Sequence, residues 1–276
     1  MSYNGVVTSS NTTVGEILEQ LAVTKTAVRP FYSQSDDVTY VVSLINSGAA
    51  ALTGITLTDN LGSYELNGLT LTPLTYRNGS VRYYTNGVLQ PAPVVTAGAN
   101  NIAIDGITVP ANGNATVVYE AMPNRFASPD SNGSITNTVS ASGDGIAEAV
   151  SASETVTAEN APQLSILKAM SPTVVSENGQ LTYTLTIQNL GNAAVTAAED
   201  VIVADRFAPI LNPISVTFNG TAWAEGTNYT YNETTGQFAT SAGQITVPAA
   251  TFVQDTTTGE WTITPGTSTI VITGTI

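Results

Sequence analysis

Two lysines in matching contexts are the side chains of this sequence that most invite chemistry. Lys25 and Lys168 are two of only seven basic residues, and an aspartate follows each in a similar stretch, Asp59 or Asp205. A buried lysine has a lowered pKa, and a nearby carboxylic acid can carry the proton while the neutral amine attacks a side-chain amide. One reaction that these residue types permit is an amide bond, formed with loss of ammonia, between Lys25 and Asn137.

In the second half of the chain, the corresponding trio would be Lys168, Asp205 and Asn4 of another copy, so the bond would join two molecules. The alternative in both halves is a plain salt bridge or a solvent-exposed pair, with Asn46 and Asn189 closing turns. A mass deficit of one ammonia for each bond distinguishes the two interpretations.

The elements that must position these residues occur twice in the chain. TYVVSLINSGAA at 39–50 is nearly repeated by TYTLTIQNLGNA at 182–193, and GITVPA at 106–111 by QITVPA at 244–249. Four residues recur 143 positions later: Lys25, Tyr40, Asn46 and Gly48 match Lys168, Tyr183, Asn189 and Gly191. The sequence is therefore interpreted as an internal duplication.

Alternating polarity predicts strands through most of the chain. In LTYTLTIQN at 181–189, apolar residues alternate with Thr and Gln, which is typical of a half-buried antiparallel strand. Asn-Gly marks hairpin turns because both residues tolerate positive φ, and it occurs at 4, 67, 78, 86, 112, 132, 178 and 219. The one helix candidate, VGEILEQL at 14–21, fits an extended linker equally well. The predicted fold is all-β: two tandem Ig-like antiparallel β-sandwiches with an N-terminal β-strand arm.

Composition argues against several classes of function. The 276 residues suffice for two domains, and 42% of them are hydrophobic while only 10% are charged. A net charge of −14 repels nucleic acid and anionic lipid, so neither is expected as a partner. The absence of Cys and His excludes disulfides, thiolate nucleophiles and zinc sites, and no cofactor is expected. No run of 18 apolar residues occurs, and the start has no secretory signal pattern, so a signal is either unused or already removed.

The two copies differ at their ends. We expect an N-terminal arm at 1–20, a first Ig-like repeat at 21–158, a linker at 159–163 and a second repeat at 164–276. The first copy continues through enough residues for a final strand or hairpin, whereas the second copy has no such continuation and lacks its last strand.

The arm resembles the strand that the second copy lacks. SYNGVVTSS places Asn4 and Val6 as SITNTVSAS places Asn137 and Val139. An open sandwich edge can be filled by a strand from an identical neighbour, and a head-to-tail contact of this kind propagates into a filament. The predicted donor strand comprises Tyr3, Asn4, Val6 and Val7, with Tyr3, Val6 and Val7 as the buried plugs. The alternative is an arm that packs on its own first domain.

Four short motifs in the first copy carry a family resemblance. They are Lys25-Thr26, Val38-Thr39-Tyr40, Asn46-Ser47-Gly48 and Thr58-Asp59-Asn60-Leu61. With these motifs the chain resembles the Ig-like bacterial surface repeat catalogued as domain of unknown function eleven. The second copy departs from the pattern at Lys168-Ala169 and at Ala204-Asp205-Arg206-Phe207.

This resemblance implies spacers and building blocks of cell walls, sheaths and appendages, and no enzyme activity. Some Ig-like surface domains also join a first-strand lysine to a last-strand asparagine, and this resemblance is what implies the pairing of Lys25 with Asn137. In its tandem architecture and size, the chain further resembles the subunits of ribbon-shaped endospore appendages, which are made in the mother-cell cytoplasm and deposited on the spore.

Other candidate sites have ordinary explanations. Acidic residues at 36–37, 128–134, 142–148 and 199–200 lack the alternating spacing of a calcium loop, so no metal site is expected. A glycosidase needs only a carboxylate pair, but no pair recurs near an aromatic cleft. Trp223 and Trp261 could stack on sugars, although packing is the commoner role of such residues.

Taken together, the sequence predicts a structural subunit that self-assembles head to tail into a filament by donating its N-terminal strand. Its expected partners are copies of itself. Other surface or spore-coat proteins are a second class of partner that the resemblance implies. The expected location is the bacterial surface, specifically the spore surface or its appendages, with a secreted cell-wall protein as the alternative. The alternative function is a monomeric spacer or adhesin module of a cell-surface protein.

Overall fold

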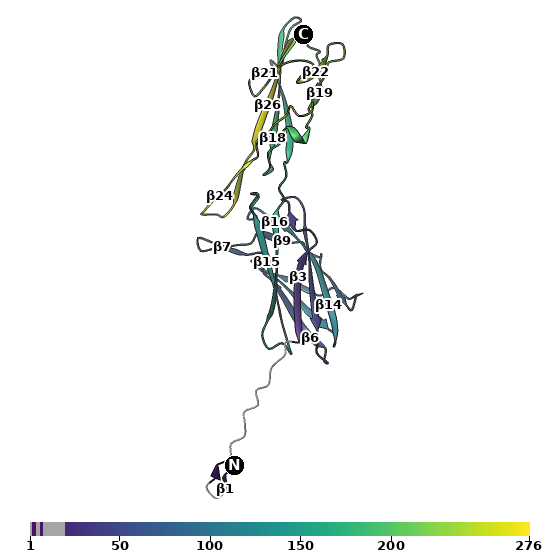
Figure 1. Ribbon diagram of the computed structural model, residues 1–276, viewed down its shortest axis with the longest axis vertical. Coiled ribbons are helices and arrows are strands. Elements are labelled where there is room, and N and C mark those ends of the chain that lie inside the picture. The colour runs from purple at the N-terminus through teal and green to yellow at the C-terminus, as the bar shows by residue number, and fades with distance from the viewer. Residues whose placement is uncertain (1, 4–5, 8–19) are drawn as a thin grey trace.

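The computed structural model describes residues 2–3, 6–7 and 20–276. Within them the fold is all-β, as predicted, and the only helical segment is a short 3-10 turn, η1 (Ala197–Glu199). Two β-sandwiches follow one another along the long axis of the molecule (Figure 1). We call residues 20–158 repeat one and residues 164–276 repeat two. None of the described helical segments has the length and apolar character needed to cross a membrane.

Repeat one is a sandwich of two six-stranded sheets around one core. The first sheet has the order β11 (Val88–Leu89), β10 (Arg82–Thr85), β14 (Gly113–Pro123), β5 (Val38–Asn46) and β3 (Leu21–Ala27), with β9 (Leu74–Tyr76) also pairing with β14. The second has the order β12 (Val94–Ala97), β13 (Ile102–Val109), β6 (Leu52–Asp59), β15 (Ser134–Ser142), β16 (Val150–Ala158) and β4 (Phe31–Tyr32). A separate hairpin joins β7 (Tyr64–Leu66) to β8 (Leu69–Leu71).

Repeat two has a similar first sheet and a much smaller second one. Its five-stranded sheet has the order β17 (Leu164–Ser171), β18 (Gln180–Asn189), β26 (Gly266–Thr275), β20 (Ile214–Phe218) and β21 (Thr221–Trp223). The facing sheet contains only β19 (Ala204–Arg206), β23 (Gln237–Thr240) and β22 (Tyr229–Asn232). A further hairpin, β24 (Thr251–Gln254) with β25 (Trp261–Thr264), completes the repeat.

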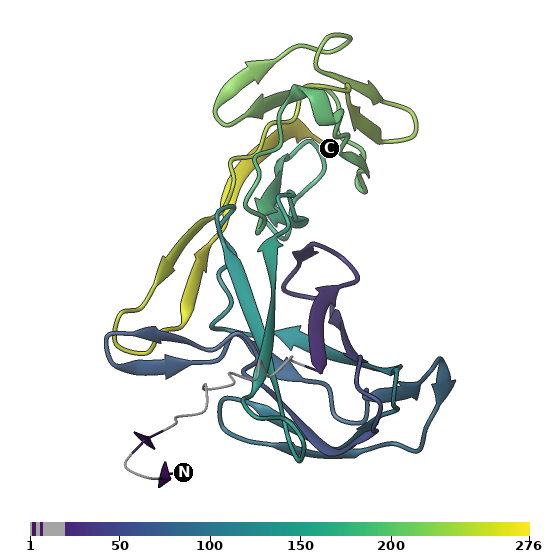
Figure 2. The ribbon, with the colours of Figure 1, turned by 60° about the horizontal axis from the view of Figure 1, so that its bottom comes forward.

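That hairpin extends from repeat two towards repeat one, where it lies beside the β7–β8 hairpin (Figure 2). Gln254 donates a hydrogen bond of 2.7 Å to the Tyr64 hydroxyl, and the Trp261 backbone N–H donates one of 3.1 Å to the carbonyl of Arg125. The Arg125 guanidinium also lies 3.2 Å from the Glu260 carboxylate. These contacts connect the two repeats outside the 159–163 segment.

The strands form where the alternation of side chains predicts them. In β18, the buried side chains are Leu181, Tyr183, Leu185 and Ile187, and the intervening Thr and Gln side chains are half-buried. The strand therefore packs one face against the core and turns the other outward. Each large apolar side chain that is fully buried stabilises the folded state by about 1.5–3 kcal/mol.

An Asn-x-Gly motif, whose asparagine is the last residue of the strand, ends both β5 and β18. In repeat two, Asn189 is fully buried; its Oδ1 accepts from the backbone N–H groups of Gly191 and Gln163, both at 2.9 Å. Its Nδ2 donates to the carbonyls of Ala193 at 2.7 Å and Pro248 at 3.0 Å. One amide therefore satisfies groups from three segments, as buried polar groups require.

The glycine of this motif makes room for the incoming chain. A Cβ at Gly191 would lie 2.2 Å from the carbonyl oxygen of Ala161, closer than any side chain permits. In repeat one, Asn46 makes the equivalent bonds: it accepts from Gly48 at 2.9 Å and donates to Ala50 at 2.8 Å. The role of these asparagines in closing turns is thus confirmed for both copies.

The sequence predicts hairpin turns at the Asn-Gly pairs, but not every pair forms one. Two-residue hairpin turns with positive φ at both residues occur at 67–68, 86–87 and 219–220. The pair at 112–113 instead connects β13 and β14, which belong to opposite sheets, and the pair at 178–179 precedes β18. Positive φ therefore suits Asn-Gly to any tight reversal, whether or not the flanking strands pair.

The described residues of the N-terminal segment form two short strands. Instead of one continuous strand, β1 (Ser2–Tyr3) and β2 (Val6–Val7) pair with each other, Ser2 opposite Val7 and Tyr3 opposite Val6. The Asn-Gly at 4–5 separates them, which agrees with the hairpin preference of that dipeptide. The helix candidate at 14–21 falls mostly outside the described residues; its last residue, Leu21, begins β3.

We expect Asn189→Ala to lower the free energy of unfolding of repeat two by about 3 kcal/mol, because several buried backbone groups lose their partner. Both tryptophans of the chain, Trp223 and Trp261, lie in repeat two, so tryptophan fluorescence during urea denaturation reports on this repeat. The adjacent Gln188, whose side chain makes no hydrogen bond with the described residues, supplies the matched control, Gln188→Ala. Equal unfolding midpoints for the two variants would contradict the assigned role.

Candidate functional site

Asp59, the last residue of β6, is the centre of a buried polar cluster in repeat one. Its Oδ2 atom accepts hydrogen bonds from the Lys25 ammonium and from the Tyr119 hydroxyl, and its Oδ1 accepts the backbone N–H of Leu61 at 2.9 Å. The Lys25 and Asp59 side chains are both completely buried. Lys25 comes from β3 and Tyr119 from β14, so three strands converge on this carboxylate.

Asn137, from β15, joins the same cluster. Its Nδ2 donates to the Tyr119 hydroxyl at 3.2 Å, and the whole residue is buried. Its Oδ1, also buried, has no hydrogen-bond donor among the described residues. A buried carbonyl oxygen without a donor is uncommon in native proteins and requires an explanation.

The surroundings make Lys25 a better nucleophile than an ordinary lysine. Burial lowers its pKa to about 8, and the attraction of Asp59 only partly opposes this effect. Its ammonium lies 4.7 Å from the centre of the Tyr40 ring and 5.7 Å from that of Tyr119, so aromatic faces shield it from water. Burial also raises the pKa of Tyr119 well above its ordinary value, which keeps this hydroxyl a donor.

The cluster contains every group that amide formation needs. Transfer of a proton from the Lys25 ammonium to Asp59 would leave a neutral amine, which would attack the Asn137 side-chain carbonyl carbon while the Asp59 carboxyl lends its proton to the carbonyl oxygen. The C–N bond to the side-chain –NH₂ would then break, and the proton of the attacking nitrogen would pass to the leaving group. As ammonia departs, the carbonyl oxygen would return its proton to Asp59. No oxidant or reductant is required, because the carbon keeps its oxidation state.

All three residues predicted for this site in repeat one, Lys25, Asp59 and Asn137, come together in the structure. Sequence reasoning missed Tyr119 and the part played by Tyr40. Both side chains point inward from strands whose residues alternate between buried and more exposed positions. The two residues lie directly opposite each other on the paired strands β14 and β5, with ring centres 5.6 Å apart. Their position opposite each other could be found only once the strand register was known.

Repeat two contains an open version of the same cluster. The Lys168 ammonium lies 2.6 Å from Asp205, but 38% of the Lys168 side chain and 19% of that of Asp205 remain exposed. The lysine again lies over two rings, Tyr183 at 4.6 Å and Phe207 at 5.4 Å. No Asn or Gln of the described residues hydrogen-bonds to this pair, and Asn4, the predicted partner, lies outside the described residues.

Lys168 and Asp205 are partly exposed because no hairpin of the described residues covers β17. In repeat one the β15–β16 hairpin packs against β3 and buries Leu21 and Lys25. Among the described strands of repeat two, none takes that place, and every residue of β17 is exposed. The sequence predicts the absence of one strand, whereas the described part of repeat two lacks counterparts of both β15 and β16.

The edge next to Asp205 is open as well. In repeat one, β6 pairs with β13 on one side and with β15 on the other, and Asp59 lies opposite both Ile102 and Val139. In repeat two, the corresponding strand β19 pairs only with β23 among the described strands. Repeat two thus presents an unpaired strand edge beside an uncovered sheet face.

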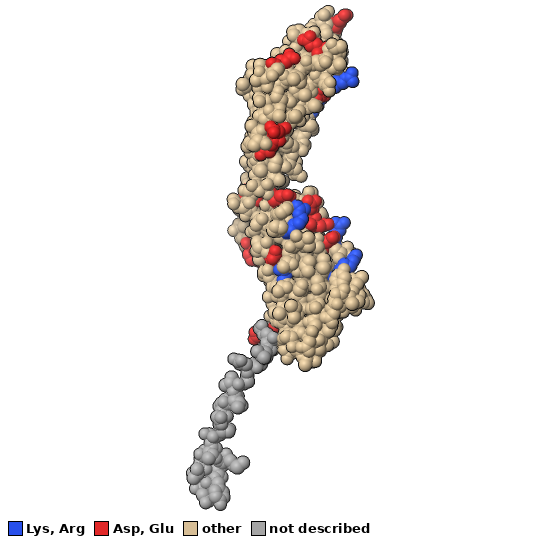
Figure 3. Space-filling model, turned by 45° about the vertical axis from the view of Figure 1, so that its right-hand side comes forward, with Lys and Arg blue, Asp and Glu red and all other residues tan. Residues whose placement is uncertain are grey.

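The acidic loops serve as turns in this structure. Glu199 and Thr196 form a capping box around η1, and Asp130 accepts the Asn132 backbone N–H at 2.9 Å. Within the described residues, no group of three or more Asp, Glu, His or Cys side chains comes together. Acidic side chains are scattered over the face shown in Figure 3.

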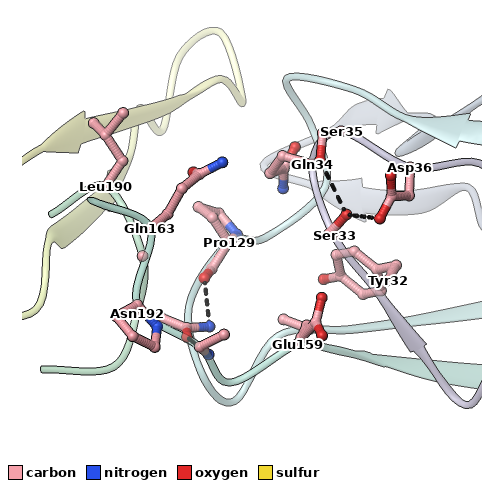
Figure 4. Close-up of a pocket in the computed structure, with 14 residues that line it drawn as sticks. Tyr32, Ser33, Gln34, Ser35, Asp36, Pro129, Glu159, Gln163, Leu190 and Asn192 are labelled. Atoms are coloured by element: carbon pink, nitrogen blue, oxygen red, sulfur yellow. Dashed lines mark hydrogen bonds between the residues drawn. The ribbon is translucent and has the colours of Figure 1, made fainter. Parts of the chain in front are cut away.

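A polar pocket lies where the two repeats meet (Figure 4). Ser33 donates to Asp36 at 3.0 Å, and Asn192 donates to the Pro129 carbonyl at 3.0 Å. The Asp36 and Glu159 carboxylates each lie 3.8 Å from the guanidinium of Arg29. The polar groups of the pocket are therefore used in contacts within and between the repeats.

The two tryptophans do not share a sheet. Trp223 on β21 stacks on Phe218 with ring centres 4.8 Å apart, and Trp261 lies on β25 in the hairpin that contacts repeat one. Each therefore has a packing role, and the structure does not join them in one sugar-binding face.

Comparison with known proteins finds only distant structural similarities. No family model matches the chain, and no curated protein matches it significantly. Among solved structures, the pilus backbone protein of Streptococcus pneumoniae has a TM-score of 0.36 and 10% identity, covering 89% of this chain and 55% of that one. The major pilin of Bacillus cereus has a TM-score of 0.37 and 10% identity, covering 90% and 66%. A collagen-binding domain from a Staphylococcus aureus adhesin has a TM-score of 0.28 and 13% identity, covering 52% and 99%. The chain thus spans less than two thirds of these two pilus subunits.

We expect the intact protein to weigh less than its sequence by the mass of one ammonia, because Lys25 and Asn137 have joined. Asp59→Asn should restore the full mass, since no acid remains to carry the proton. High-resolution mass spectrometry measures both, and a digest should contain one branched peptide that links the two residues. An unmodified mass for the folded wild-type chain would contradict the assigned chemistry in repeat one.

A pH dependence follows for the variant Asn137→Ala, in which Lys25 stays free. The pKa of Lys25 is about 8 in the fold and about 10.5 when unfolded, so between these values the unfolded chain binds the extra proton. Stability should therefore rise with pH, by about 2 kcal/mol between pH 7.5 and 9.5. The facing tyrosines, Tyr119 and Tyr40, do not supply this rise, because their pKa values are raised by burial.

Urea denaturation followed by circular dichroism measures this slope, with the tryptophan fluorescence of repeat two as an internal reference. The same variant carrying Lys25→Met and Asp59→Asn supplies the control and should lose the rise. A flat profile for Asn137→Ala itself would show that Lys25 keeps an ordinary pKa.

Proposed function

We propose that this chain is a structural subunit whose copies join head to tail, the N-terminal residues of one copy completing repeat two of the next. The proposal assigns no reaction on an external substrate. It takes the bacterial surface as the site of action, and the resemblance to appendage subunits favours the spore surface.

The single observation that carries the proposal is the uncovered side of repeat two. Leu164 is 39% exposed, against 4% for its counterpart Leu21 in β3. Ile166, whose counterpart Val23 is half-buried, is 51% exposed. An unpaired strand edge and exposed apolar side chains at the same place favour the addition of a strand.

The occupant that fits is a segment of a second copy. Residues 1–10 place Asn4 and Val6 as β15 places Asn137 and Val139, and β15 is the strand that occupies this position in repeat one. In β15, Asn137 and Val139 are buried while the residues between and after them are only half-buried. A strand in the same register would direct Asn4 and Val6 inward and Tyr3 and Val7 outward. Of the three predicted plugs, Tyr3, Val6 and Val7, only Val6 would then be buried.

Donation requires the β1–β2 pairing to open, because one strand cannot be both a hairpin and a continuous ladder partner. The hairpin has two residues in each strand, and isolated two-stranded hairpins are marginal in water. The cost of opening is therefore small compared with the backbone bonds gained in the acceptor.

The contact joins different surfaces of the two molecules, the N-terminal segment of one and repeat two of another. A heterologous contact of this kind produces rings only if the rotation closes, and otherwise an open filament. Since each copy has one donor segment and one acceptor edge, every addition leaves a new acceptor available.

We expect Val6→Asp to abolish polymers, because a carboxylate would be buried without a partner in the acceptor core. Val7→Asp is the matched control: it adds the same charge at an outward position and should still polymerise. Negative-stain microscopy and light scattering of the purified proteins measure assembly, and circular dichroism checks that both remain folded.

Removal of residues 1–12 should likewise leave a folded monomer. Polymers that persist after this deletion would refute donation by the N-terminal segment. A wild-type protein that remains monomeric under all conditions would instead favour the alternative, a spacer or adhesin module of a surface protein.

A further inference from the structure

We propose that Lys168 and Asp205 are two thirds of a second amide-forming centre, and that Asn4 of another copy completes it, so that neighbouring subunits become covalently joined. This inference rests on the head-to-tail assembly proposed above. It extends that assembly by a chemical step, and it assigns a modification site to a lysine on the exposed β17.

The two clusters agree in the parts that both contain. In each, a lysine from the first strand pairs with the aspartate of the strand across the sandwich, Lys25 with Asp59 and Lys168 with Asp205. The ammonium lies 4.7 Å from the Tyr40 ring centre in repeat one and 4.6 Å from that of Tyr183 in repeat two. The Lys–Asp pair is thus already in position in repeat two, without the strand that carries the amide.

The register of repeat one locates the third member. Val139 lies opposite Asp59, and Asn137, two residues earlier, points to the same face. A donated segment in this register places Val6 opposite Asp205 and Asn4 two residues before it, at the position from which Asn137 enters its cluster. The asparagine and the valine therefore arrive together in one strand.

Exposure explains why the reaction would wait for assembly. In the free subunit, 38% of the Lys168 side chain is in contact with solvent, so water still reaches the pair. Removal of water disfavours the charged form of a buried amine. A docked strand would displace this water and bring the amide at the same time. Both conditions for the bond would then be met only in the polymer.

One part of the complete centre is not reproduced. Tyr119, whose hydroxyl links Asp59 to Asn137, lies opposite Tyr40, whereas the residue opposite Tyr183 is Ile272. Asp205 alone would therefore carry the proton, and the bond in repeat two should form more slowly than the one in repeat one.

The step is balanced without any co-reactant. The Lys168 Nζ forms a bond to the side-chain carbonyl carbon of Asn4 and gives a proton to Asp205. The bond from that carbon to Nδ2 breaks, and Asp205 transfers the proton to the departing nitrogen. Each junction loses one ammonia and gains one secondary amide.

The first test uses polymers of the full chain, boiled in sodium dodecyl sulfate and separated on a gel. Wild-type polymers should give a ladder of covalent multimers, whereas Lys168→Arg and Asn4→Ala should give monomers after boiling although microscopy shows polymers before it. Asn137→Ala, which removes only the amide of repeat one, should keep the ladder. Wild-type polymers that dissolve completely into monomers would overturn the inference while leaving the assembly intact.

The second test does not depend on polymers. A synthetic peptide of residues 1–12 is added in excess to the full-length Asn4→Ala protein, whose own N-terminal segment cannot react. The expected product weighs the sum of both minus one ammonia, with the branch mapped to Lys168; the same peptide with Asn4→Ala should give none. An adduct without polymers would uphold the centre and refute the filament, and no adduct would refute the centre.

Discussion

Burial of the Lys25–Asp59 pair depends on one element, the β15–β16 hairpin. It closes the sandwich of repeat one by pairing with β6 along one edge and by covering β3, whose inward face carries the lysine. Taking a charged pair out of water is expensive, and only good partners on all sides compensate for it. The same hairpin that removes the water also brings Asn137, so desolvation of the amine and delivery of its partner are one structural event.

The two repeats share their framework and differ in this cover. Asn46 and Asn189 hold the ends of β5 and β18 with equivalent hydrogen bonds, and β5 and β18 bury the same alternating face. The exposed Lys168 is therefore not a sign of a distorted repeat. Its sheet is built as in repeat one, and the difference lies in the strands that would lie across it.

Much of this arrangement could be predicted from the sequence, for identifiable reasons. Alternation identifies β18, and the recurrence 143 positions apart pairs Lys25 with Lys168 before any coordinates are known. Asn137 could be grouped with Lys25 and Asp59 because the duplication indicates which segments form the first and last strands. The partners that depend on register could not be predicted. Tyr119 reaches Asp59 across the sandwich because the pairing of β14 with β5 turns its side chain inward, and a shift of one residue would turn it outward. Nor does a local pattern reveal that β24 and β25 extend towards repeat one, because contacts such as Gln254 with Tyr64 join residues far apart in the chain.

The two clusters have similar geometry and differ in when they would be covered. Both lysines lie over a tyrosine and beside an aspartate, so the sheets alone establish the ion pair. The two pairs differ in their access to water: the Lys25 side chain is completely buried, whereas that of Lys168 is 38% exposed. Burial lowers the pKa of Lys25 and so favours its neutral form. A cover encoded within the same repeat, as in repeat one, acts as soon as the domain folds. A cover supplied by a second molecule would act only on contact, so one cluster design can serve folding in one half of the chain and assembly in the other.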